Sequence, residues 1–367
     1  MQKWEYTFPP TSKEDWIRQI EQDLKGKSIQ SLNSEWWPGE PLVPVHHASD
    51  TAAEPIVLPE QWFVSPPRIV EAVEIVEAVE ADNGLEGRIN KILLEALQYG
   101  TQSFLITNES QSGIRHEQML EGIFPEMIQW HFYAHANAMP LFRSILKRTP
   151  QNSFLRFQRL KDSPDLKSTL TDEFKIHPAD ISSLQFEFEY DFSSTGNWIE
   201  TTIQVIQRLL ADKANWESMD TASSFFEKCI LKLDADVQYF KQVIQSRVLH
   251  LLWLNLTREH SSIISNPSHH LECHIQPKTG EKPEHYLIRS SLSALAATLT
   301  GTASLCIHHT QDTGAPDFYK RIDRNLHHLL HLESGLPSGK DPLAGAYTLD
   351  YYTRNWTERI WNQLLEK

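Results

Sequence analysis

The chain has 367 residues, 40% of them hydrophobic, and a formal net charge of −14, with 34 Lys plus Arg against 48 Asp plus Glu. This length and apolar content can supply a large buried core, in two domains or in one large barrel. The acidic balance repels phosphate backbones and anionic lipid, so a nucleic-acid or membrane-surface partner is not expected. Three widely spaced cysteines indicate a reducing compartment, and no signal peptide or long apolar run is seen, so a cytoplasmic protein is expected.

Residues 1–65 are predicted to form a short helix and then an extended arm. Apolar residues between positions 16 and 24 follow helical spacing, but the next stretch is rich in proline, which excludes a helix interior. Trp36, Trp37 and Trp62 in this stretch are apolar anchors that need a surface to cover them. The arm is expected to lie either on its own domain or on a partner.

After residue 65, short apolar stretches alternate with amphipathic ones, which is the pattern of strands followed by helices. Strands are predicted at 73–79, 103–107, 127–133, 153–158, 184–190, 229–233, 271–275 and 303–308. Helices are predicted near 85–98, 114–121, 137–148, 197–213, 235–258, 284–299, 316–333 and 351–366.

Eight strands that alternate with helices predict an α/β fold, a (β/α)8 TIM barrel over residues 66–367, rather than an open doubly wound sheet. No GxGxxG sequence follows any strand, so a dinucleotide fold lacks its usual support. The first strand is the least determined, because Val70, Val73, Val76 and Val79 also fit the spacing of a helix.

In such a barrel, functional residues gather where the strands end and in the loops that follow. The polar residues at these positions are Asn108, Glu109, His135, Tyr190, Asp191, Asp234, Asp236, His274, Gln276 and residues 308–312.

The histidines do not predict a metal ion. His327 and His331 have helical i, i+4 spacing but lack the glutamate of an HExxH motif, so a solvated helix face is expected. His308 and His309 are expected to be hydrogen-bonded residues of the barrel rim.

The sequence does not predict a catalytic carboxylate pair or a Cys–His dyad either. Asp234 and Asp236 are expected to begin the helix at 235–258, where acidic groups suit the positive end of the dipole. Cys273 and His274 alternate along a strand and face opposite sides, which argues against a Cys–His dyad. Residue chemistry alone therefore predicts a barrel without an assigned reaction.

Several long segments resemble the methylmalonyl-CoA mutase family. They are "YLIRSSLSALAATLTGTASLCIHHTQD" (286–312), "RIDRNLHHLLHLESGL" (321–336), "DPLAGAYTLDYYT" (341–353), "YFKQVIQSRVLHLLW" (239–253) and, at the start, "WIRQIEQDLKGKS" (16–28). The resemblance implies a cobalamin-dependent rearrangement of acyl-CoA skeletons, in a barrel threaded by the pantetheine arm of CoA. It also implies a separate cobalamin domain with a D-x-H-x-x-G motif, and this motif does not occur in the 367 residues.

The fifth strand departs from the family pattern. Catalytic members end this strand in a Tyr-His pair, followed by a turn that resembles "EAGAT". When Gly196 is placed on the glycine of that turn, Tyr190 falls on the tyrosine and Asp191 on the histidine. An imidazole can donate a proton to a substrate carbonyl near neutrality, whereas an aspartate repels a thioester or enolate-like oxygen.

The remaining family positions are matched in part. His274 and Gln276 match a family run that resembles "RTHSQTSG", but Glu272 replaces its arginine. Arg247 matches an arginine that helps to hold CoA phosphate. The resemblance thus implies substrate-binding roles for Arg247, His274 and Gln276, and no catalytic residue in this chain.

The resemblance therefore indicates the small, non-catalytic subunit of a heterodimeric mutase, with adenosylcobalamin and catalysis in a large partner subunit. Whether this chain is itself an enzyme stays open. The alternatives are an acyl-CoA mutase chain that uses a cobalamin domain supplied in trans, and a cobalamin-free barrel that binds a CoA thioester.

Overall fold

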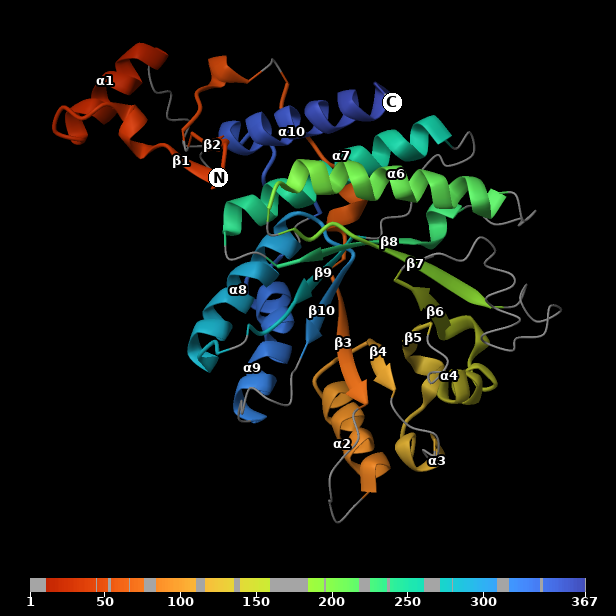
Figure 1. Cartoon of the computed structure of the whole chain (residues 1–367). Helices are drawn as coiled ribbons and strands as arrows, with labels where there is room; N and C mark the ends of the chain where they lie inside the picture. Colours follow the sequence, from red (N-terminus) through yellow and green to blue (C-terminus); the bar gives the residue numbers. More distant parts are fainter. Residues whose placement is uncertain are drawn as a thin grey trace, which may run out of the picture.

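Eight parallel strands close into a barrel at the centre of the molecule, in the order β3 to β10 with β10 paired to β3 (Figure 1). The computed structural model describes residues 11–43, 45–51, 54–65, 67–75, 84–109, 116–134, 139–158, 184–194, 196–217, 225–235, 238–260, 271–278, 280–308, 317–336 and 339–366. The barrel strands are β3 (Arg68–Ile75), β4 (Ser103–Glu109), β5 (Gln129–Tyr133), β6 (Ser153–Phe157), β7 (Gln185–Asp191), β8 (Cys229–Asp234), β9 (Leu271–Ile275) and β10 (Ser304–His308). The predicted (β/α)8 barrel is confirmed.

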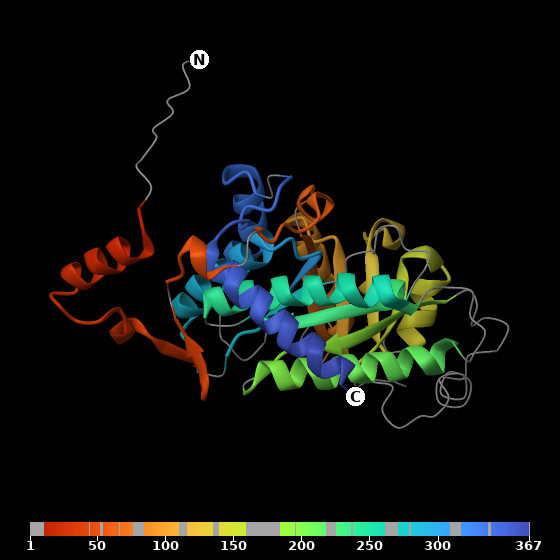
Figure 2. The ribbon, with the colours of Figure 1, turned by 90° about the horizontal axis from the view of Figure 1, so that it is seen from above.

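Helices surround the barrel and follow the predicted alternation. They are α2 (Gly84–Gln98), α3 (His116–Met119), α4 (Met139–Leu146), α6 (Trp198–Glu217), α7 (Tyr239–His260), α8 (Pro283–Leu299), α9 (Asp317–His328) and α10 (Tyr347–Leu365), with a π-helical turn at Leu329–Glu333. The last helix, α10, lies across α6 and α7 on the outside of the barrel (Figures 1 and 2). None of the described helices is both long and apolar enough to cross a membrane.

The first barrel strand begins earlier than predicted. It starts at Arg68, which pairs with Ser304 of β10, whereas the valine pattern places its start at residue 73. The difference arises because the pairing with β10, and not the valine spacing, determines where the strand begins. Residues 76–79 lie outside the described residues.

Side chains alternate between the interior of the barrel and the layer under the helices. On β9, Cys273 and Ile275 join an apolar cluster with Ala294 of α8, while His274 between them faces the interior. The prediction that Cys273 and His274 face opposite sides is therefore confirmed.

One surface prediction is wrong. His327 of α9 is only 8% exposed, and burial lowers its pKa to about 3, so it is a neutral core residue. The helix packs against α8 on this side, and helical spacing alone does not show which face is covered. His331, one turn further on, is exposed as predicted.

The arm packs on the body of its own chain through its tryptophans. Trp36 and Trp37, from the hairpin of β1 (Ser34–Trp37) and β2 (Glu40–Leu42), lie 5.8 and 5.1 Å from Trp356 of α10, measured between ring centroids. Each of the two is at most 7% exposed. This part of the arm therefore uses the surface of α10.

The arm then reaches the side of α7 near the end of α8. Trp62 lies 4.7 Å from His250 of α7, and Phe63 is fully buried. Gly301 takes a φ of +70°, and a Cβ atom there would meet Phe63 at 3.1 Å. Glycine is required at this turn for both reasons.

The first helix, α1 (Lys13–Asp23), stands away from the barrel (Figure 2). None of its residues is buried, although Trp16, Ile17 and Ile20 form its apolar stripe. An ion pair between Lys13 and Asp50 ties its start to the arm.

Candidate site in the barrel interior and mouth

Arg156 of β6 crosses the interior of the barrel. Its guanidinium donates to Glu187 Oε2 at 2.8 Å on β7 and to Glu272 Oε1 at 2.6 Å on β9, and it lies 3.4 Å from Glu189 Oε2. Arg156 has no exposed surface, and the three glutamates are at most 8% exposed. Because β7 and β8 separate β6 from β9, the side chain spans the interior at this level.

Two buried carboxylates of this network, Glu187 and Glu272, have pKa values that are lowered, so both stay ionised. Burial alone would raise the pKa of Glu187, but Arg156 and His131 lower it to about 2. Burial would also raise the pKa of Glu272, but Arg156 and His274 outweigh it and hold this pKa well below its usual value. The carboxylates and the guanidinium thus compensate one another, as buried charges must.

A second cluster joins β9 and β10 at the mouth. His274 Nδ1 lies 2.8 Å from Nε2 of His308, and His274 Nε2 lies 2.7 Å from Oε1 of Glu272. Cys306 Sγ is 3.7 Å from the same Nε2 of His308. The parallel register pairs Cys306 with His274, which is why these side chains meet.

Asp191 ends β7 at the mouth and pairs with a lysine. Its Oδ2 accepts a hydrogen bond from Lys232 Nζ at 2.9 Å, and Asp234 lies 3.7 Å from the same ammonium. Partial burial opposes ionisation of Asp191, but Lys232 prevails and lowers its pKa. The side chain at this position is therefore an ion-paired carboxylate, without the proton that an acid catalyst supplies.

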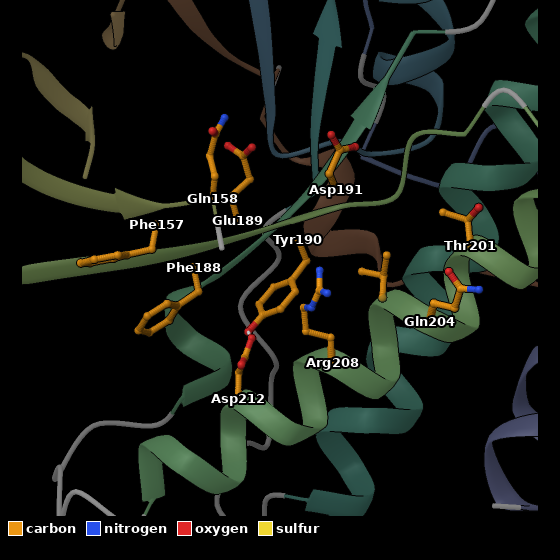
Figure 3. Close-up of a pocket in the computed structure, with 11 residues that line it drawn as sticks. Phe157, Gln158, Phe188, Glu189, Tyr190, Asp191, Thr201, Gln204, Arg208 and Asp212 are labelled. Atoms are coloured by element: carbon orange, nitrogen blue, oxygen red, sulfur yellow. Dashed lines mark hydrogen bonds between the residues drawn. The ribbon is translucent and has the colours of Figure 1, made fainter. Parts of the chain in front are cut away.

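Tyr190 lies on the other face of the strand. Its hydroxyl donates to Asp212 Oδ2 of α6 at 2.9 Å, and burial raises its pKa (Figure 3). Figure 3 shows Tyr190 directed toward Asp212, while Asp191 points away from α6. These residues line a pocket of about 260 Å³ between β7 and α6. Tyr190 and Asp191 therefore do not converge on one point.

Arg247 of α7 is held inside the protein. It has no exposed surface, and its guanidinium donates to Asp341 Oδ1 and Oδ2 at 2.9 and 2.8 Å. It also donates to the carbonyl of Ile56 at 2.8 Å and lies 3.5 Å from Asp350 of α10. In this structure it ties the arm to the C-terminal segment, and its role as a CoA phosphate ligand stays a prediction.

The other predicted residues are only partly brought together. Gln276 is exposed just beyond β9 and donates to Asp234 Oδ1 at 3.2 Å. Asp234 ends β8, and α7 begins at Tyr239, so the prediction that Asp234 starts the helix is wrong. Its carboxylate instead pairs with Lys232 and accepts the hydrogen bond from Gln276.

Some predicted residues cannot be placed. Residues 135, 236 and 309–312 lie outside the described residues, and only the backbone of β4 is described at positions 108 and 109.

Sequence reasoning missed the charged interior. The signal was present in β7, where Glu187, Glu189 and Asp191 alternate with aromatic residues. Both faces of a barrel strand are buried, so acidic residues on one face require cations on facing strands. Arg156 and Lys232, which stand in otherwise apolar strands, are those cations.

The fold and site define a (β/α)8 barrel whose interior holds a buried ion network. Residues 213–366 match the family model of methylmalonyl-CoA mutase. A methylmalonyl-CoA mutase of Rhizobium meliloti is 29% identical over 136 residues, which cover 35% of this chain and 19% of that protein. The Escherichia coli methylmalonyl-CoA mutase is 42% identical over 77 residues, which cover 20% of this chain and 11% of that protein.

This C-terminal part of the chain is therefore similar to the methylmalonyl-CoA mutases. The matched residues include the segment 239–253, while the likeness expected for residues 16–28 lies outside the family match. The chain spans less than a fifth of the length of these two relatives. Among solved structures, a dihydropteroate synthase from Xanthomonas albilineans is similar in backbone, with a TM-score of 0.42 and 11% sequence identity. The alignment covers 74% of this chain and 95% of the synthase chain.

Proposed function

We propose that this mutase-related chain is the non-catalytic subunit of a heterodimeric, cobalamin-dependent methylmalonyl-CoA mutase. In that role it stabilises a larger catalytic chain that carries the substrate and the cofactor. The family match over residues 213–366 supports the relation to the mutases. The position of Arg156 is the observation that carries the non-catalytic role.

Arg156 lies where a CoA arm would have to pass. A pantetheine chain that threads the barrel needs an open path along its axis, and the Arg156 guanidinium occupies that path between β6 and β9. Displacing it would leave Glu187, Glu189 and Glu272 buried without their shared cation. Removing one partner of a buried ion pair costs about 3–5 kcal/mol, which opposes entry of the thioester.

The end of β7 also supports this role. Asp191 is held ionised by Lys232, so it would repel a thioester oxygen rather than donate a proton to it. Tyr190 is engaged with Asp212 on the outer face of the strand.

His274 at the barrel mouth is poorly placed to ligate cobalamin. An imidazole that reaches the cobalt of a corrin has to be accessible at the protein surface, and His274 is fully buried. The proposal therefore assigns adenosylcobalamin to the partner chain.

Helix α1 is the surface proposed to meet the partner. Its apolar stripe is only partly covered, with Trp16 against His47 of the arm, and the helix projects away from the body of the chain (Figure 2). Apolar side chains that remain accessible in this way are typical of interaction sites.

Co-expression with the methylmalonyl-CoA mutase chain of the same genome tests the assembly. Size-exclusion chromatography should give one peak that contains both chains, and two separate peaks would overturn the proposal. Ile20→Asp on the apolar stripe should weaken co-elution. Gln19→Asp adds the same charge on the exposed side of α1 and should leave co-elution unchanged.

Calorimetric titration of the isolated chain with a CoA thioester tests the closed interior. No saturable heat is expected, because Arg156 blocks the axis. Saturable binding at one thioester per chain would contradict this reasoning and favour an acyl-CoA-binding barrel.

A further inference from the structure

The strongest unassigned cluster lies where β9 and β10 meet at the barrel mouth. Three potential metal ligands converge there: His274 Nδ1, His308 Nε2 and Cys306 Sγ all lie within 4.8 Å of one another. They come from two neighbouring strands, so the hydrogen-bonded backbone of the barrel fixes their spacing.

We propose that His274, Cys306 and His308 bind a zinc ion, with the fourth coordination position open toward the barrel mouth. This inference does not depend on the subunit role proposed above. Imidazole nitrogen with thiolate sulphur is the donor set that zinc prefers, and three protein ligands plus one open position is the arrangement of zinc sites that bind water.

The distances suit a tetrahedral ion after a small adjustment. With zinc–nitrogen bonds of about 2.0–2.1 Å and a zinc–sulphur bond of about 2.3 Å, ligand atoms lie about 3.3 Å apart for N···N and about 3.5 Å for S···N. Cys306 Sγ and His308 Nε2 are 3.7 Å apart, which is close to the expected separation. His274 Nδ1 and His308 Nε2 are 2.8 Å apart and need to open by about 0.5 Å as the ion replaces the shared proton.

Glu272 already orients His274 for this role. The Nε2–H of His274 donates to Glu272 Oε1 at 2.7 Å, which leaves the lone pair of Nδ1 directed toward His308. A carboxylate behind the ligating histidine is a recurring feature of zinc sites and raises the basicity of the ring. Arg156 in turn holds Glu272 in place at 2.6 Å.

The charge of the interior also favours a divalent cation. Among the described residues, the carboxylates that face the interior and the mouth exceed the cations that compensate them. Arg156 serves three glutamates, and Lys232 serves two aspartates. A divalent ion next to Glu272 would offset part of this excess.

A competing set of ligands is less suitable. Glu189, Glu272 and His274 also lie within 4.8 Å of one another. The two carboxylates of this set are already bound by Arg156, whose positive charge would repel an added cation. On the β10 side, Glu272 lies between the guanidinium and His274 and is hydrogen-bonded to both.

Cobalt titration of the full, tag-free chain tests the site, because Co²⁺ reports a thiolate ligand by a near-ultraviolet charge-transfer band. We expect saturation at one Co²⁺ per chain, with a thiolate band that one equivalent of Zn²⁺ removes. Mg²⁺, which prefers oxygen ligands, should not compete. Absence of saturable binding of Co²⁺ and of Zn²⁺ would overturn the proposal.

Matched variants identify the ligands. Cys306→Ser should abolish the thiolate band and weaken Zn²⁺ binding by at least about 100-fold, because losing a ligand costs more than losing the hydrogen-bond partner of a ligand. Cys273→Ser is the control, because Cys273 is equally buried but faces the helix layer. A band that persists in Cys306→Ser would refute the assignment.

A second measurement keeps the test decisive if Cys306→Ser folds poorly. His308→Gln alters a half-buried side chain at the mouth and should weaken Zn²⁺ binding by a similar factor. Zn²⁺ should raise the Tm of the unaltered chain and of Cys273→Ser, but not that of His308→Gln. An equal rise in all three proteins would show that the ion binds elsewhere.

Discussion

Replacing Arg156 by methionine tests whether the interior network holds the barrel together. The change keeps an unbranched apolar stem but removes the cation that Glu187, Glu189 and Glu272 share. Removing one partner from a buried ion pair costs about 3–5 kcal/mol. Here each glutamate keeps at least one other hydrogen-bond partner. Glu187 keeps His131 and Glu189 keeps Tyr133, while Glu272 keeps both His274 and Ser304. We therefore expect a loss of about 4 kcal/mol, rather than the sum of three broken pairs.

The pH dependence of this loss has a definite sign. Arg156 helps to hold the pKa of Glu187 at about 2, below its usual 4.5, so this stabilisation is full above pH 4.5 and fades as the pH falls toward 2. In Arg156→Met the pKa of the buried carboxyl groups is raised, because no cation compensates their charge. As the pH falls, these groups are protonated in the folded variant, and their mutual repulsion is relieved. The difference between Arg156→Met and the unaltered chain should therefore be largest near pH 7 and should narrow toward pH 4.

Thermal and urea unfolding at pH 7 and pH 4.5 measure both effects. A loss of about 4 kcal/mol corresponds to a fall in Tm on the order of 10 °C for a chain of this size. Arg18→Met is the control, because its pair with Asp15 is exposed and is worth less than about 1 kcal/mol. A loss for Arg156→Met that is as small as that of the control, or a loss that is independent of pH, would refute the reasoning.

Three further predictions concern the core and the arm. The pKa of the buried His250 and His327 is lowered to about 3, chiefly by burial, while the unfolded chain takes up these protons near 6.5. The Tm should therefore decrease as the pH falls from 7 to 4, and a constant Tm over this range would count against it. Trp356→Ala should lower the free energy of unfolding by about 3–5 kcal/mol and should make residues 34–42 sensitive to limited proteolysis. Unchanged resistance of residues 34–42 to the protease would show that the tryptophan contacts do not hold the arm. Gly301→Ala should destabilise by about 1–3 kcal/mol, because the new Cβ atom meets Phe63 at φ +70°, and urea unfolding indistinguishable from that of the unaltered chain would disprove this.

The barrel could be predicted from the sequence because its strands are short apolar runs separated by amphipathic helices. The eight predicted strands overlap the eight observed ones. The boundary of the first strand was wrong because valines at positions 70, 73, 76 and 79 follow helical spacing and do not mark where a strand begins. Pairing with β10, a contact distant in sequence, decides where that strand begins.

The candidate site was harder to predict, because it depends on contacts between strands that are distant in sequence. The end of β7 was located correctly, yet the partners of Asp191 and Tyr190 come from β8 and α6. Arg156 could not be connected to Glu272 without the closed barrel, since 116 residues separate them. The roles of Arg247, His274 and Gln276 in substrate binding stay predictions.

The docking of the arm has a consequence for how the chain folds as it is synthesised. The backbone amide of Leu58 donates to Asp341 at 3.1 Å across a separation of 283 residues. At the usual rate of about 5–20 residues per second, roughly 15–60 s pass between the emergence of these two residues from a ribosome. During this interval Trp36 and Trp37 of the arm have no α10 to pack against. The arm therefore stays uncovered, and prone to aggregation, until the C-terminal segment has been synthesised.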